Sequence, residues 1–123
     1  MKTYLAHIAF GWLAATGVLH FLVDVVSQYV RGKRPPGDAA TLYYGLNTAF
    51  SLGQVLFGLL CLWLVWRQPD FLANRMIAVL CVAGGAGWLA ITYAFMEYRE
   101  PKIVAMIFLA LLIAAIVAAR PIH

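Results

Sequence analysis

The residues with the greatest chemical potential in this sequence are a histidine and an aspartate within its first apolar stretch. His20 and Asp24 are four residues apart, so an α-helix brings them to the same face. Ionisable side chains at membrane depth are rare and costly, and they usually face a bundle interior or a wet cavity. A carboxylate stabilises an imidazolium whereas burial favours the neutral ring, so this pair could hold or relay a proton near neutral pH.

The composition predicts an integral membrane protein. The 123 residues are 64% hydrophobic and only 11% charged, which excludes an ordinary soluble globule. A membrane-crossing helix needs roughly 20 apolar residues, and four such runs account for nearly the whole chain. We expect one transmembrane domain over residues 1–123, an all-α four-helix bundle with up-down-up-down topology and helices at about 4–30, 41–66, 74–98 and 103–119.

Charged residues lie almost entirely in the short connections between these helices. The formal charge of +4 comes from nine basic and five acidic residues, and basic loops beside apolar spans favour anionic lipid headgroups over nucleic acid as partners. The two membrane sides would carry four and five basic residues, which leaves the orientation open: Lys2, Arg67, Arg75 and Arg120 against Arg31, Lys33, Arg34, Arg99 and Lys102.

Polar residues recur at helical spacing on three of the four expected helices. Counted from the helix ends, Asp24, Asn47 and Tyr93 lie roughly 9 to 10 Å inside the same membrane surface, so we expect them to meet. His20 lies deeper and Glu97 lies close to the surface. The predicted pocket between the first three helices has the following ligand-binding residues: His20, Asp24, Tyr44, Asn47, Ser51, Gln54, Tyr93 and Glu97.

Several functions are compatible with this pattern. The side chains could form a structural seam of hydrogen bonds that specifies which helices touch. They could instead line a pocket that binds or transports a small molecule or a lipid-like ligand, with proton coupling through His20 and Asp24. A membrane enzyme would use the same pair as acid and base on a lipid-soluble substrate. A structural or accessory subunit of a larger membrane complex is a further alternative.

No motif in the sequence identifies a catalytic residue, a cofactor or a metal site. Nucleophile motifs, phosphate-binding loops and CxxC pairs are absent from the sequence. His7 and His20 are thirteen residues apart on one expected helix, about 20 Å along its axis, so they cannot ligate one ion. Cys61 and Cys81 lie in apolar segments, where buried free thiols are the expected state.

The last two helices have distinctive compositions. The third contains the run Ala83–Gly87, whose small residues allow close helix approach; packing within the chain is favoured over a homo-oligomer contact. The fourth, from Ile103 to Ala119, has no polar side chain. We therefore expect the fourth helix to face lipid.

Four short motifs stand out along the chain: Gly17-x-x-His20, the Tyr44-Gly45-x-Asn47 segment that opens the second helix, the following Phe50-Ser51-Leu52 and the aromatic segment before Pro101. In these motifs the chain resembles an uncharacterised family of small four-helix bacterial inner-membrane proteins. The GxxH start is also similar, more weakly, to the DoxX-like membrane proteins. The resemblance implies a four-helix fold in a bacterial inner (plasma) membrane and transfers no activity.

Overall fold

Four long helices make up the structure, a computed structural model that describes residues 2–120. Each helix is long and apolar enough to cross a membrane, which confirms the predicted all-α transmembrane four-helix bundle. The first comprises an α-helix, a π-helical segment and a last short turn: α1 (Lys2–Phe21), η1 (Leu22–Ser27) and α2 (Gln28–Val30). The others are α3 (Asp38–Arg67), α4 (Arg75–Phe95) and α5 (Glu100–Ala119), with a 3₁₀ turn, η2 (Phe71–Ala73), between α3 and α4.

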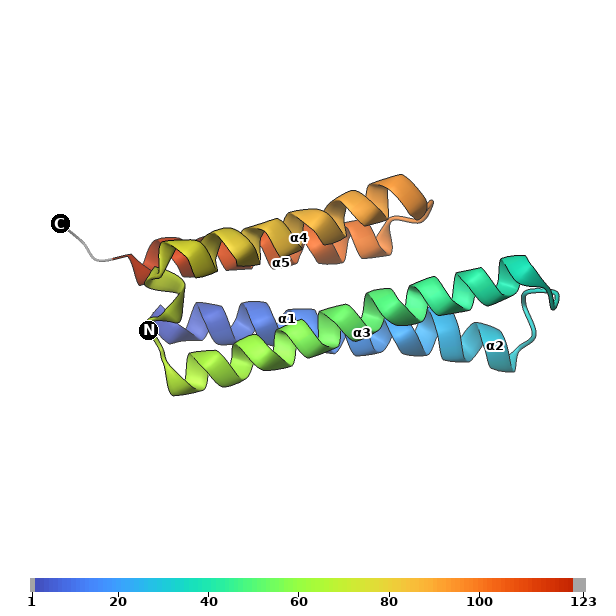
Figure 1. Cartoon of the computed structure of the whole chain (residues 1–123), viewed down its shortest axis with the longest axis horizontal. Helices are drawn as coiled ribbons and strands as arrows, with labels where there is room; N and C mark the ends of the chain where they lie inside the picture. Colours follow the sequence, from blue (N-terminus) through green and yellow to red (C-terminus); the bar gives the residue numbers. More distant parts are fainter. Residues whose placement is uncertain (1, 121–123) are drawn as a thin grey trace.

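The helices alternate in direction, and α1 lies at the centre of the packing (Figure 1). It packs against both α3 and α5, whereas α4 packs mainly on α5. The chain start, the α3–α4 connection and the end of α5 meet at one end of the bundle, which we call the Arg75 end. The loop after α2 and the turn before α5 lie at the other end, which we call the Tyr98 end.

The core forms where α1, α3 and α5 meet, around the fully buried ring of Phe10. The ring centroid of Phe10 lies 6.3 Å from that of Phe57 and 6.0 Å from those of Phe71 and Phe108. Phe108 and Leu112 of α5 are also 0% exposed. The expectation that the last helix faces lipid is therefore wrong: its inner face is part of the core.

Glycines set the distance between neighbouring helices. A Cβ atom on Gly58 of α3 would lie 2.9 Å from the Ala14 nitrogen and 2.9 Å from the Phe10 carbonyl oxygen of α1. Gly17 of α1 would similarly meet Gln54 and Val55 of α3. These contacts bring the α1 and α3 backbones together, as small residues commonly do in membrane bundles.

One glycine of the small-residue run of α4 packs closely within the chain. A Cβ atom on Gly85 would lie 2.6 Å from Leu109 Cδ2 of α5, so the contact with α5 explains why a glycine suits this position. Cys61 and Cys81 are buried free thiols, as predicted, and they neighbour each other between α3 and α4.

Three helix boundaries at the Tyr98 end differ from the sequence prediction, and the first is the start of α3 at Asp38 instead of about residue 41. α4 ends at Phe95 instead of Tyr98, and α5 begins at Glu100, one residue before Pro101. Proline is tolerated in the first turn of a helix because its missing N–H has no partner there. Because α4 is shorter than predicted, Tyr98 lies in the connection between α4 and α5. Its side chain therefore does not follow the helical spacing of either helix.

Gly58→Ala should destabilise the bundle by about 1 to 3 kcal/mol, because the added methyl meets backbone atoms that cannot rotate away. Gly53→Ala on the same helix is the matched control, since no atom lies within 4 Å of its Cβ position; it should be neutral or gain up to about 1 kcal/mol from helix propensity. The measurement is the free energy of unfolding in detergent, followed by circular dichroism. Equal effects of the two substitutions would contradict the close α1–α3 approach.

Candidate functional site

The His20 ring joins two helices through both of its nitrogens. Nδ1 lies 2.8 Å from Asp24 Oδ2 within the same helical segment, and Nε2 lies 2.9 Å from Asn47 Oδ1 of α3. The His20 and Asp24 side chains are only 8% and 12% exposed. A buried polar group is costly unless it is hydrogen-bonded, so these two contacts are what allow the ring to lie inside an apolar bundle.

The orientation of Asn47 determines how many protons the His20–Asp24 pair holds. The Asn47 Nδ2 atom donates to the Tyr43 carbonyl oxygen at 2.9 Å, so Oδ1 faces His20 and can only accept. His20 Nε2 must therefore carry a proton. The Nδ1–Oδ2 contact needs a second proton, on the ring or on the carboxyl group. In both arrangements, imidazolium with carboxylate or neutral ring with carboxylic acid, the pair has no net charge.

Asp24 lies in the π-helical segment η1, which the sequence analysis did not predict. A π-helical turn contains an additional residue, and such segments occur frequently at functional sites. The signal in the sequence is the run Val23-Asp24-Val25-Val26, because β-branched residues are stiff in an α-helix and lower its propensity. Within this segment Asp24 and Val25 are buried.

A cavity of about 390 Å³ lies beside the pair, at the junction of the first helix, α3 and the start of α5. Its volume falls within the range of small-molecule pockets, roughly 300 to 1,000 Å³. Most of the wall is apolar, with a few polar side chains. The lining residues are Thr16, Leu19, His20, Val23, Asp24, Phe50, Gln54, Tyr98, Glu100, Pro101 and Val104.

Five of the eight predicted site residues lie at or directly behind this cavity. His20, Asp24 and Gln54 line the cavity. Asn47 does not line it but is hydrogen-bonded to His20. Ser51 is buried one helical turn from Asn47, and its hydroxyl has no hydrogen-bond partner among the described residues.

The other three predicted residues lie outside the cavity, so the expected contribution of the third helix is wrong. Tyr93 is 61% exposed, and Lys102 Nζ of α5 lies 5.3 Å from its ring centroid. Glu97 is exposed in the connection after α4. Tyr44 packs against the rings of Tyr29 and Tyr43.

The third wall of the pocket comes from the α4–α5 connection and from α5, and it is not among the walls predicted from the sequence. Tyr98, Glu100, Pro101 and Val104 supply it. The available signal was Pro101, which is typical of the first turn of a helix and places the preceding aromatic residue in a connection. The Tyr98 hydroxyl is buried and has no hydrogen-bond partner among the described residues.

The surroundings of Tyr98 favour its uncharged form. Burial raises the pKa of the Tyr98 phenol above its usual value, and the nearby Asp24 and Tyr43 side chains raise it further. A raised pKa means that the folded protein retains this proton more strongly than the unfolded chain does. Tyr98 therefore remains a protonated phenol near neutral pH, and its hydroxyl is available to donate a hydrogen bond.

No family model, curated protein or solved structure matches this chain. The role of the site therefore follows from its geometry alone. Within residues 2–120, no group of three or more histidine, cysteine, aspartate or glutamate side chains has the arrangement of a metal site.

Tyr98 should ionise at a higher pH than an ordinary solvent-exposed tyrosine side chain, for which the reference pKa is about 10. Phenolate absorbance should be titrated for the folded wild type and for Tyr98→Phe, and the difference should show a phenol that ionises after the others. Because the folded-state pKa is raised, the stabilising contribution is complete below pH of about 10 and decreases as the pH rises further. A difference titration that coincides with that of the exposed tyrosines would contradict the buried placement.

Proposed function

We propose that this protein resides in the bacterial inner (plasma) membrane and binds a small lipid-soluble ligand in the cavity beside His20 and Asp24, with proton coupling. The observation that carries the proposal is a pair of unpartnered polar groups on a largely apolar wall. Among residues 2–120, the Tyr98 hydroxyl has no hydrogen-bond partner, and the Gln54 side-chain amide has none either. A ligand that satisfies these groups offsets their desolvation.

The wall chemistry defines the class of ligand. Leu19, Val23, Phe50 and Val104 provide apolar surface for a hydrocarbon body. Gln54 and Tyr98 provide hydrogen bonds for one polar end. The Glu100 carboxylate also lines the cavity, which disfavours an anionic polar end and favours a hydroxyl or an amine.

The His20–Asp24 pair supplies the proton coupling. With its proton retained, the pair is neutral and accommodates a neutral polar group. A cationic amine beside Asp24 favours a net negative charge on the pair, because opposite charges attract strongly in a low-dielectric site. Binding of an amine should therefore release the proton held between Nδ1 and Oδ2. The other titratable groups on this side of the pair are Tyr98 and Glu100, which line the same cavity, and Tyr43, which neighbours Tyr98.

The same geometry supports ligand binding over the two rival interpretations. A catalytic His20 would need a free ring nitrogen, and both nitrogens are engaged by the protein. A purely structural seam would pair its polar groups with one another, yet Gln54 and Tyr98 line a cavity and have no hydrogen-bond partner among residues 2–120. The His20–Asn47 bond belongs to such a seam, and the cavity beside it adds the binding function.

Ligand binding can be tested with chain-matched amphiphiles. A medium-chain alcohol and amine should raise the thermal unfolding midpoint of the detergent-solubilised protein, whereas the carboxylate of equal chain length should not. Tyr98→Phe should weaken alcohol binding by about three- to tenfold, the effect of one lost neutral hydrogen bond. Tyr93→Phe is the matched control, because its hydroxyl lies outside the cavity, and it should leave the affinity unchanged. Equal stabilisation by all three probes, or equal effects of the two tyrosine variants, would contradict the pocket.

The proton exchange has a separate signature within the same experiment. Amine affinity should increase with pH, by up to about tenfold per pH unit when one proton is released, while alcohol affinity should not change. Asp24→Asn should abolish the pH dependence of amine binding and retain alcohol binding. A pH dependence that persists in Asp24→Asn would reject the proton-coupled role of the pair.

A further inference from the structure

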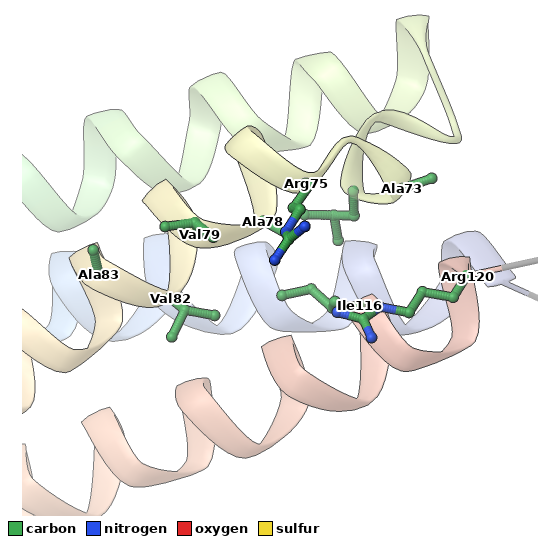
Figure 2. A pocket seen from close by; sticks show the side chains of 9 residues that line it. Ala73, Arg75, Ala78, Val79, Val82, Ala83, Ile116 and Arg120 are labelled. Atoms are coloured by element: carbon green, nitrogen blue, oxygen red, sulfur yellow. The ribbon is translucent and has the colours of Figure 1, made fainter.

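A second cavity lies at the opposite end of the bundle, between the start of α4 and the end of α5 (Figure 2). Its volume is about 750 Å³. Two arginines stand at its outer end, and small or branched apolar side chains form the rest of its wall. It shares no lining residue with the cavity beside His20.

The two arginines converge on this groove from different helices. Arg75 is the first residue of α4, and Arg120 directly follows α5. In Figure 2 both side chains extend over the groove with their guanidinium groups directed toward each other. Neither guanidinium has an ion-pair or hydrogen-bond partner within the described part of the chain. Two uncompensated positive charges therefore share one site.

The position of these charges matches the headgroup level of a membrane. Arg75 begins one candidate span, and Arg120 follows the last residue of another. Below Arg75 the groove continues past Val79, Val82 and Ala83, eight residues further along α4 and so about 12 Å deeper. Ile116 lines the opposite side, one turn below Arg120. The groove thus passes from charged to apolar with increasing depth.

A third arginine near this end, Arg67, does not belong to the groove and has a partner elsewhere. Arg67 closes α3, and its guanidinium lies 5.9 Å from the ring centroid of Trp63. This cation–π contact gives Arg67 a partner of its own. It is also absent from the residues that line the groove.

We infer that this groove binds an anionic phospholipid, with its phosphodiester between Arg75 and Arg120 and one acyl chain along Val79, Val82 and Ile116. Arginine suits this role because its planar fork donates two parallel hydrogen bonds to a phosphate. Basic pockets between membrane helices bind anionic headgroups in the same manner. Charge complementarity selects the lipid headgroup, and the apolar floor selects a lipid over a free phosphate.

Native mass spectrometry of the full chain in mild detergent tests this site directly. Dioleoyl phosphatidylglycerol and dioleoyl phosphatidylcholine, which have identical acyl chains, should be titrated separately. Wild type should retain phosphatidylglycerol at least about tenfold more strongly, because both lipids carry the phosphodiester but the quaternary ammonium of choline adds a positive charge beside the two arginines. Arg75→Gln and Arg120→Gln should each lower phosphatidylglycerol affinity by about tenfold. Arg67→Gln, which removes the same charge near the same end, should not.

A further variant separates the acyl groove from the charges. Ala83→Trp fills the deep part of the groove while both arginines remain, and it should also weaken phosphatidylglycerol retention. Glycerol phosphate, a phosphate monoester that carries at least the charge of the headgroup and has no acyl chains, should not compete. Equal retention of the two lipids would overturn the inference, as would an equal loss in Arg67→Gln or effective competition by glycerol phosphate. None of these outcomes depends on the cavity beside His20, so the two proposals stand or fall separately.

Discussion

The hydrogen bonding of one buried imidazole ring constrains the rest of this site. His20 lies in an apolar bundle, and each of its nitrogens requires a partner. Asp24 satisfies one and Asn47 the other. The Asn47 amide is in turn fixed by the Tyr43 carbonyl, so its acceptor atom must face the ring. This chain of contacts joins the first helix to α3 and gives both ring nitrogens a partner from the protein. What remains for a ligand is the adjacent cavity.

The helix packing makes these short polar contacts possible. Gly17 and Gly58 bring the backbones of α1 and α3 close together, and the His20–Asn47 contact spans the same interface. On the other side of α1, the buried face of α5 positions Pro101 and the preceding connection beside Asp24. The cavity therefore lies between the first helix, α3 and the start of α5. The central helix α1 packs against both α3 and α5.

The sequence predicts the number of spans, the His20–Asp24 pair and the contributions of Asn47 and Gln54. Composition and helical spacing suffice for these features because they depend on single helices. The role of α5 could not be predicted, because a helix that is apolar on all sides has no polar face from which its buried face could be recognised. Tyr93 was misplaced for a related reason: Thr92, not Tyr93, points inward when α4 packs on α5. The contribution of Tyr98 to the cavity depends on where α4 ends, and helix ends are the features that sequence patterns locate least well.

The protonation of His20 is the most direct test of this account. Solid-state ¹⁵N NMR of the histidine-labelled protein in lipid bilayers, with His20→Gln to assign the signals, reports which ring nitrogens carry protons. Near neutral pH we expect Nε2 to be protonated, with a second proton shared between Nδ1 and Asp24. In Asp24→Asn the ring should be neutral and still protonated at Nε2. A wild-type ring protonated only at Nδ1 would contradict the central claim, because Asn47 would then not accept a hydrogen bond from His20.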